Sequence, residues 1–307
     1  MKRATAFAPA SIGNIAVGFD ILGHSLAGPG DKVTVTLTNT GEVRIVSIKG
    51  SVTDLPKTAA ENTAGRALLH LKKSFEPSVG FDVEIEKGIA LGSGMGGSAA
   101  SAVAAVVAAN SLVDAPVGLE GLYQSAMDGE AAASGSAHGD NVGPMLLGGI
   151  VIAPTRGAAV RVPTPHWLHV ALVHPHFVLE TKRARAALAG AYELHDFVVQ
   201  SEGLALVLAG LYANDESLMR RGFRDVLVEP RRASLIPGFA QVKEAALDHG
   251  AIGASIAGAG PSVFGWFDTA PQAEKASLAM AAAFKAAGLE SDRLVSVVNG
   301  PAAKVIG

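Results

Sequence analysis

The chain has 307 residues, of which 49% are hydrophobic and 17% are charged, and its formal net charge is −3. This composition is typical of a globular chain with an ample core, and the length favours two domains. The charge excludes the strongly basic surface of a nucleic-acid-binding protein, and the absence of cysteine excludes disulfides, thiolate metal sites and cysteine catalysis. Because no uncharged apolar run reaches spanning length and the start lacks a signal-peptide pattern, we expect a cytoplasmic chain that binds neither nucleic acid nor membrane.

The N-terminal part begins with a short predicted strand at residues 4–8 and a loop of small residues at 8–23. Asn14 and Asp20 stand in this loop among apolar neighbours. Residues of this kind either bond their own turn or project into a ligand pocket. The local sequence favours the two interpretations equally.

The next elements alternate between strand and helix patterns. Strands at 33–37 and 43–48 are separated by Thr-Asn-Thr-Gly, which predicts a β-hairpin. Apolar and acidic residues alternate at 81–86, which predicts a strand with one wet face. The remaining elements predicted in this part are helices at 61–75, 98–112 and 117–133, a loop at 134–144 and a strand at 145–154.

Four glycines fall within six residues just before the 98–112 helix, at Gly92, Gly94, Gly96 and Gly97. Glycine lets the backbone approach a ligand closely, and Ser98 is predicted to cap a helix whose first N–H groups face the loop. Together they predict a phosphate site, although a flexible turn would contain the same residues. The spacing fits the dinucleotide fingerprint, but a helix follows instead of the required strand. It also fits the lysine-containing phosphate loop, but Ser98 stands in the lysine position, so a nucleotide would need a loop of a third kind.

Glu130 lies on the buried stripe of the 117–133 helix, where a carboxylate needs a partner. Together with His138 and Asp140 it suggests a zinc site, but this spacing matches no common ligand pattern. His138 is also explained as a hydrogen-bonded loop histidine.

A domain boundary is predicted near 155–157 or within 163–165. Beyond it, the elements without the inserted helices follow the β-α-β-β-α-β order of a split ferredoxin-like unit. The two central strands are joined by a Gly-rich segment at 257–262, which suggests either a hairpin turn or a second close approach to the ligand. The predicted strands are 168–173, 251–257, 262–267 and 294–299, and the predicted helices are 193–212, 216–222, 239–248 and 273–287.

Three segments resemble, in order, the motifs of the GHMP kinases, a superfamily named for galactokinase, homoserine kinase, mevalonate kinase and phosphomevalonate kinase. These segments are 8–23, 91–101 and 257–262. Finer features resemble the homoserine kinases within it, namely Asn14 with 18–23, and the segments 138–142, 181–188 and 229–239. The resemblance implies an α+β, two-domain GHMP kinase-like architecture. It places an N-terminal ribosomal-S5-domain-2-like domain at 1–160 and a C-terminal ferredoxin-like (split βαβ) domain at 161–307.

The resemblance also implies an activity, the ATP-dependent phosphorylation of the side-chain hydroxyl of L-homoserine to O-phospho-L-homoserine in threonine biosynthesis. ATP and Mg²⁺ are the implied cofactors, and a homodimer is a family expectation. Ser98 and Glu130 are the implied metal ligands, and with Asn141 they form the implied catalytic set. The residues implied for homoserine are Asn14, Asp20, His138, Asn141, Arg185 and Arg232. Those implied for the nucleotide are Asn62, Leu91, Gly92, Ser93, Gly94, Met95, Gly96, Gly97, Ser98, Ala99, Gly258 and Gly260.

The chain departs from the family pattern at three points. The second motif has Gly97 where a hydroxyl residue is usual, Ile89-Ala-Leu91 replaces a proline before the loop, and Ala257 replaces a serine. The first two changes put nucleotide affinity in question. Several relatives use an aspartate base where this chain has Asn141, which leaves Asp140 as the nearest ionisable candidate.

Two other interpretations remain. The first is a GHMP kinase acting on another small alcohol, such as mevalonate or shikimate, and the amino-acid clamp of Asp20 with two arginines argues against it. The second is a non-catalytic relative that binds ligand, and the retention of Ser98 and Glu130 argues against that.

Overall fold

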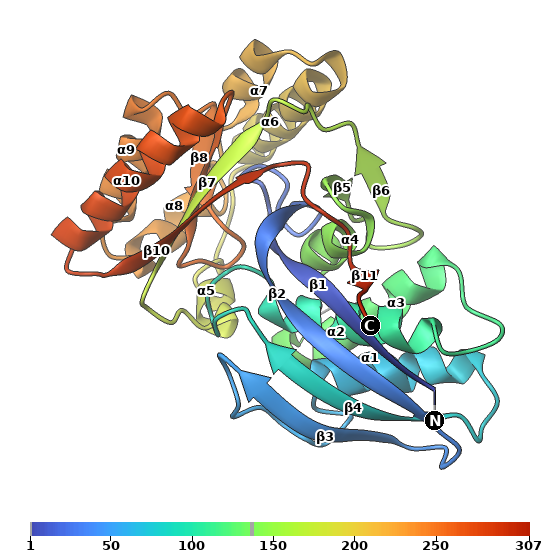
Figure 1. Cartoon of the computed structure of the whole chain (residues 1–307). Coiled ribbons are helices and arrows are strands. Elements are labelled where there is room, and N and C mark those ends of the chain that lie inside the picture. The colour runs from blue at the N-terminus through green and yellow to red at the C-terminus, as the bar shows by residue number, and fades with distance from the viewer. Residues whose placement is uncertain (1, 136–137) are drawn as a thin grey trace.

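The computed structural model describes residues 2–135 and 138–307, and these residues form two β-sheets with helices packed on them (Figure 1). The first sheet has the order β11-β1-β2-β4-β3, and β5 joins it through β2 and carries β6. Its strands are β1 (Arg3–Gly13), β2 (Leu22–Thr38), β3 (Val43–Gly50), β4 (Gly80–Lys87), β5 (Ile150–Ile152), β6 (Val160–Val162) and β11 (Lys304–Val305).

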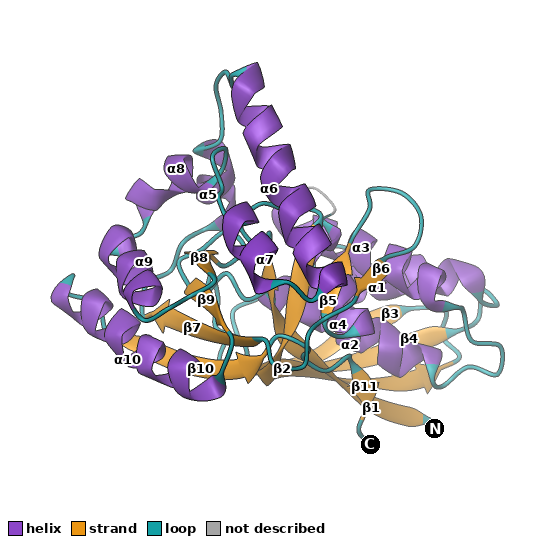
Figure 2. Ribbon diagram, turned by 90° about the horizontal axis from the view of Figure 1, so that it is seen from above, coloured by secondary structure: helices purple, strands orange, loops and turns teal. Residues whose placement is uncertain are grey.

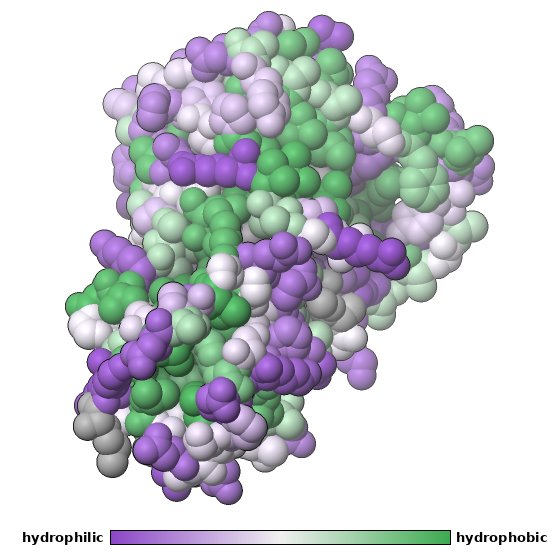
Figure 3. Space-filling view, turned by 90° about the vertical axis from the view of Figure 1, so that its right-hand side faces the viewer, coloured by the Kyte–Doolittle hydropathy of each residue, from purple (hydrophilic) through white to green (hydrophobic). Residues whose placement is uncertain are grey.

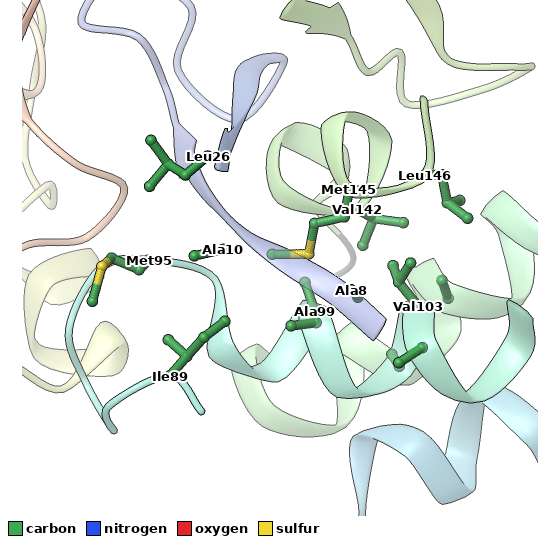
Figure 4. Packing of buried hydrophobic residues seen from close by; sticks show 14 of the residues in the cluster. Ala8, Ala10, Leu26, Ile89, Met95, Ala99, Val103, Val142, Met145 and Leu146 are labelled. Carbon is green, nitrogen blue, oxygen red and sulfur yellow. The ribbon is translucent and has the colours of Figure 1, made fainter. Parts of the chain in front are cut away.

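Helix α2 (Gly97–Asn110) lies at the centre of the first layer and contacts β1, β2 and the three other helices of this part. Its alanine and valine side chains are almost all buried, and the small side chains let the helix lie close to the sheet. Figure 4 shows Ala99 and Val103 of α2 near Ala8 of β1 and Val142 of α4. The neighbouring helices are α1 (Thr63–Leu71), continued by the short 3₁₀ turn η1 (Lys72–Ser74), α3 (Leu119–Ser134) and α4 (Gly139–Leu147).

The second sheet is antiparallel with the order β10-β7-β9-β8. Helices α9 and α10 pack on it (Figure 2), so the β-α-β-β-α-β prediction is confirmed. Its strands are β7 (His169–Pro175), β8 (Gly253–Ile256), β9 (Val263–Phe267) and β10 (Ser291–Val297). The helices of this part are α5 (Thr181–Ala186), α6 (Leu194–Ala213), α7 (Glu216–Gly222), α8 (Glu229–Arg232), the 3₁₀ turn η2 (Ala233–Leu235), α9 (Phe239–Asp248) and α10 (Ala270–Ala286).

Two short strands at or beyond the predicted boundary belong to the first sheet. β6 pairs with β5, and β11 pairs with β1 after the chain has left the second sheet (Figure 1). The domain boundary predicted between residues 160 and 161 therefore stays a prediction. β6 and β11 belong to the first sheet, although most of the residues after 160 do not.

The predicted β-hairpin is wrong, because β4 lies between the two strands that it was to join. β4 pairs antiparallel with β2 and parallel with β3. The connection at 51–79, which contains α1, is long enough for the crossover that a parallel pair requires. The acidic face of β4 then meets basic partners on both sides, with Asp82 bonded to Arg44 and Glu86 to Lys32.

The loop predicted at 134–144 and the strand predicted at 145–154 are also wrong in part. Residues 139–147 form α4 and the strand covers only 150–152, while residues 136 and 137 lie outside the described residues. Val142 and Met145 are completely buried, so core packing overrides the weak helix propensity of this glycine-containing segment.

The cap predicted at Ser98 is wrong as well. Gly96, with φ of 72°, occupies the N-cap of α2, and Ser98 lies inside the first turn. Its hydroxyl is directed to a partner on α3, which is described below.

Helix α6 is long and apolar enough to cross a membrane by length and composition, although it carries Asp196 and Glu202. Leu194 and Val198 are exposed near its start, and Figure 3 shows apolar side chains gathered on the upper part of the face drawn there. A single helix of this kind is weak evidence for a membrane span, because core helices of soluble proteins can have the same length and composition.

Candidate active site

A cavity of about 550 Å³ brings together most of the residues predicted for the site. This volume is in the range of small-molecule sites. Its predicted members are Asn14, Asp20, Asn62, Leu91, Gly92, Ser93, Gly94, Gly96, Gly97, Ser98, Glu130, His138, Asn141, Arg185, Arg232 and Gly258. Met95 and Ala99 are buried, and these two and Gly260 are not among the lining residues.

The glycine loop, residues 91–97, has a backbone that requires glycine at three positions, Gly92, Gly94 and Gly96, which all have positive φ. Gly94 has φ of 79°, and a Cβ there would lie 2.4 Å from the carbonyl oxygen of Ala257. Gly96 has φ of 72°, and a Cβ there would lie 2.7 Å from Oδ1 of Asn141. The loop therefore packs against both the Gly-rich turn at 257–262 and helix α4, in a conformation that L side chains rarely adopt.

Carbonyl groups of the glycine loop accept hydrogen bonds from neighbouring segments. The backbone N–H of Ser11 donates to the Met95 carbonyl at 3.2 Å, and the hydroxyl of Ser262 donates to the Ser93 carbonyl at 2.6 Å. The first N–H groups of α2 follow directly and have no acceptor within their own helix. The loop and this helix end together can bind an anion.

Ser98 and Glu130 lie beside the start of α2. The Ser98 hydroxyl donates to Oε1 of Glu130 at 2.9 Å. Burial raises the pKa of Glu130 to about 7, while the Ser98 hydrogen bond and the positive charge of Lys87 act in the opposite direction. A buried carboxylate next to a hydroxyl oxygen fits Mg²⁺, which prefers oxygen ligands and binds through one or two carboxylates plus substrate phosphates.

The zinc interpretation receives no support from the described residues. In 2–135 and 138–307, no group of three His, Asp or Glu side chains is arranged to hold a metal ion. A site with one carboxylate and one hydroxyl would therefore need phosphate oxygens and water to complete the coordination of Mg²⁺.

Charged side chains gather at the other end of the cavity. Arg185 donates to Asp20 through both terminal nitrogens, at 3.1 and 2.9 Å, and Nδ1 of His138 lies 3.3 Å from the same carboxylate. The Phe19 ring lies beside the guanidinium groups of Arg185 and Arg232, with ring-centre distances of 5.4 and 5.3 Å. The cavity thus presents a carboxylate and two guanidinium groups within one small region.

Arg232 is 2% exposed and is fixed by backbone acceptors. Its Nε donates to the carbonyl of Ala184 and its Nη1 to the carbonyl of Gly258, both at 3.1 Å. Burial and then the neighbouring Arg185 charge lower the pKa of Arg232 from its usual value. An anion placed here would relieve both unfavourable effects.

Asn14 organises its own loop as well as lining the cavity. Its Nδ2 donates to the carbonyl of Gly258 at 2.8 Å, and its Oδ1 accepts from the backbone N–H of Asp20 at 3.0 Å. Asn14, Ile15 and Ala16 all have positive φ. Backbone strain of this kind persists where the surroundings hold it in place, often at a functional site.

Asp140 and Asn141 lie in the first turn of α4 and line the cavity. Burial and then the negative charge of Asp20 raise the pKa of Asp140 to about 7. Oδ1 of Asn141 accepts from the Ser11 hydroxyl at 2.8 Å, and its Nδ2 donates to Asp140 at 3.3 Å. Asp140 is therefore the group of this pair that can exchange a proton near neutral pH.

The side-chain amide of Asn62 caps the N-terminus of helix α1. Its Oδ1 accepts from the N–H groups of Ala64 and Gly65, and its Nδ2 donates to the carbonyl of Pro56. The predicted contact with the nucleotide competes with this cap. Apolar side chains that suit a flat ring also line the cavity, namely Val52, Leu55, Pro56, Ile85 and Ile89.

Lys87 is a cavity residue that the sequence interpretation missed. It is 6% exposed and bonds Asp31 and the carbonyl of Gly97 beneath the glycine loop. A signal was present, because residues 81, 83, 85 and 87 share the apolar face of a period-two strand. A lysine on that face must be buried and paired.

Two family models match the chain, "GHMP kinases N terminal domain" over residues 62–149 and "GHMP kinases C terminal" over 207–286. A homoserine kinase of Xanthomonas campestris pv. campestris is 57% identical over 306 residues, which cover 100% of this chain and 95% of the relative. A homoserine kinase of Chloroherpeton thalassium is 43% identical over 305 residues, covering 95% of this chain and 96% of the relative.

Solved structures give the same result. The crystal structure of homoserine kinase from Cytophaga hutchinsonii matches with a TM-score of 0.94 and 42% identity, covering 100% of this chain and 98% of that one. A Lactococcus lactis galactokinase matches with a TM-score of 0.70 at 12% identity, covering 99% and 95%, which shows the fold alone. Given these full-length similarities and the three GHMP motifs around one cavity, the chain belongs to the homoserine kinase family of the GHMP kinases.

Proposed function

We propose that the chain transfers the γ-phosphoryl group of ATP to the side-chain hydroxyl of L-homoserine, giving O-phospho-L-homoserine for threonine biosynthesis. The carrying observation is a single cavity with an anion-binding loop at one end and an amino-acid clamp at the other. Phosphoryl transfer depends mainly on positioning and charge stabilisation, so this arrangement supplies what the reaction needs. Membership of the homoserine kinase family supports the same substrate.

The nucleotide is proposed to bind with its phosphates against residues 92–97 and the first turn of α2. The backbone N–H groups there can donate to phosphate oxygens, and the helix dipole favours their negative charge. Ser98 and Glu130 are proposed to hold Mg²⁺, which would neutralise charge on the phosphates. The apolar wall formed by Leu55, Pro56 and Ile89 is proposed to take the base.

Homoserine is proposed to bind by exchanging partners with an ion pair of the protein. Its ammonium can replace Arg185 at Asp20, and its carboxylate can then bind Arg185 and Arg232. Binding separates the ion pair between Asp20 and Arg185, but it brings in one ammonium and one carboxylate from homoserine. Each buried charge therefore keeps a partner of opposite sign. His138, which lies against Asp20, completes the clamp.

The middle of the cavity is proposed to receive the hydroxyl of homoserine. The amide of Asn141 can bond this hydroxyl but cannot accept its proton. Asp140 adjoins that amide and has a pKa of about 7, so it is the residue proposed to take up the proton.

A coupled assay of ADP release with a panel of small alcohols tests this function. We expect turnover with L-homoserine and little with mevalonate, shikimate or homoserine amide. Faster turnover with mevalonate or shikimate would assign a sister GHMP kinase activity, and ligand binding with no ADP release would indicate a non-catalytic relative. The predicted cytoplasmic location and homodimer stay proposals, which fractionation and size-exclusion chromatography with light scattering test.

A further inference from the structure

A buried acid–base pair lies beneath the glycine loop. Asp31 on β2 and Lys87 at the end of β4 form an ion pair whose side chains are 0% and 5% exposed. We propose that this pair holds residues 88–97 in the conformation that binds the nucleotide, so that Asp31 and Lys87 are positioning residues of the kinase. The proposal rests on the proposed function, because it assumes that the loop binds ATP phosphates.

The ammonium group of Lys87 is saturated by the protein itself. It donates to Oδ2 of Asp31, to the carbonyl oxygen of Gly97 and to Oγ of Ser101, the last at 2.9 Å. An ammonium group has three N–H donors, and these three acceptors use all of them. Lys87 therefore lines the cavity without a spare donor for phosphate, which separates it from the lysine of a phosphate loop.

The pair ties both ends of the loop segment to one point. At the start, Oδ1 of Asp31 accepts from the backbone N–H groups of Gly88 and Ile89, at 3.0 and 3.3 Å. At the end, Lys87 bonds the carbonyl of Gly97, the first residue of α2. Residues 88 and 97 are thereby fixed relative to each other before any ligand binds.

The segment needs such fixing because of its composition. Half of the residues from 88 to 97 are glycine, the residue that loses the most conformational freedom when it is ordered. If the loop were ordered only on binding, that entropy would be subtracted from the affinity for ATP. The Asp31–Lys87 pair orders residues 88–97 already in the free protein, so this entropy cost is not incurred when ATP binds.

A buried ion pair is a poor device for stability alone. Its desolvation usually offsets the attraction between the charges, so neutral residues of similar shape often stabilise a protein as well or better. Asp31 instead uses its other carboxylate oxygen, and Lys87 one of its other two N–H donors, on the backbone of residues 88–97. Holding the loop backbone thus explains why this ion pair is buried, which a contribution to stability alone would not.

The test compares two charge-neutral double variants, Asp31→Asn/Lys87→Met and Glu229→Gln/Lys243→Met. The control pair joins α8 to α9, its side chains are 26% (Lys243) and 12% (Glu229) exposed, and neither residue lines the cavity. Calorimetry measures the affinity of each protein for ATP in the absence of homoserine. Hydrogen exchange measures the protection of amides 88–97 without nucleotide, and thermal unfolding checks that each variant is folded.

We expect Asp31→Asn/Lys87→Met to bind ATP at least tenfold more weakly than the wild type and to exchange amides 88–97 faster. The control variant should bind ATP within twofold of the wild type. An affinity within twofold of the wild type for Asp31→Asn/Lys87→Met, or an equal loss in both variants, would overturn the proposal. Failure of the wild type itself to bind ATP would instead overturn the proposed function and this inference with it.

A milder variant keeps the proposal testable if the double variant does not fold. Lys87→Arg retains the charge, but a planar guanidinium cannot direct donors at all three acceptors. It should weaken ATP binding measurably, by at least threefold, and leave the KM for homoserine unchanged. Unchanged ATP affinity in this folded variant would also overturn the proposal.

Discussion

The stability of the protein should depend on the protonation of His24, a completely buried residue of β2. The indole N–H of Trp266 on β9 donates to Nε2 of His24 at 3.3 Å, and an indole nitrogen can only donate. Nε2 must therefore be unprotonated, and the proton on Nδ1 is donated to the Ser25 carbonyl at 3.0 Å. Because β2 and β9 belong to different sheets, this neutral imidazole links the two halves of the chain.

Burial lowers the pKa of His24 from 6.5 to about 4, although the Ser25 hydrogen bond opposes the shift. The unfolded chain then binds a proton before the folded chain does as the pH falls. The stability is complete above the unfolded pKa and is lost as the pH falls from about 6.5 towards 4. A shift of this size corresponds to roughly 3.4 kcal/mol in total, of which about 2.4 kcal/mol falls between pH 7 and 4.5.

The assay is chemical denaturation of the wild type and His24→Phe at pH 7 and 4.5. Phenylalanine keeps the packing against Trp266 but loses the hydrogen bonds to Trp266 and Ser25, so the variant should be less stable than the wild type at pH 7. Because phenylalanine cannot titrate, the variant should lose about 2.4 kcal/mol less free energy of unfolding than the wild type on acidification. Glu130 and Asp140, whose raised pKa values of about 7 act in the opposite direction, are present in both proteins and cancel in the comparison. His195→Phe, at an exposed histidine, is the control and should follow the wild type. Equal losses on acidification in wild type and His24→Phe would refute the reasoning.

Three further predictions concern the site. Glu130→Gln should stay folded and lower kcat by roughly a hundredfold or more, because an amide is a poor Mg²⁺ ligand, and turnover near that of the wild type would rule out the metal role. Arg185→Lys and Arg232→Lys should raise the KM for homoserine roughly ten- to a hundredfold and leave the KM for ATP nearly unchanged, as measured by steady-state kinetics. Equal turnover of homoserine amide and homoserine by the wild type would mean that no carboxylate clamp exists. Gly96→Ala should abolish ATP binding in calorimetry and lower the Tm, since the new Cβ would meet Asn141 at 2.7 Å, and unchanged affinity would contradict the loop assignment.

Local patterns were sufficient for most of the second sheet and its helices. The helix predicted at 239–248 has the bounds of α9, and the strand predicted at 262–267 begins one residue before β9. These elements are bounded by glycine or turn residues, and their apolar period is clear. For the Gly-rich turn at 257–262 the composition predicts either a hairpin turn or a close approach to the ligand, and Gly258 lines the cavity.

Elements that depend on distant partners could not be predicted in this way. β4 enters between β2 and β3 because of pairings across the sheet, and a hairpin pattern contains no information about them. Helix α4 forms because Val142 and Met145 reach a core that other segments build. The N-cap predicted at Ser98 is wrong for the same reason, since the hydroxyl partner of Ser98, Glu130, comes from another helix.

The site residues were predicted from the family motifs, but their mutual dependence follows only from the structure. Asn14 and Arg232 both donate to the carbonyl of Gly258, and the N–H of Gly258 donates to the carbonyl of Gly13. The same turn packs against Gly94 in the glycine loop. One short turn therefore contacts the loop that would bind the nucleotide, the loop that carries Asp20, and the arginine that would bind the carboxylate of homoserine. A shift of that turn would move both ends of the cavity together, so neither domain alone could hold the two substrates in line for phosphoryl transfer.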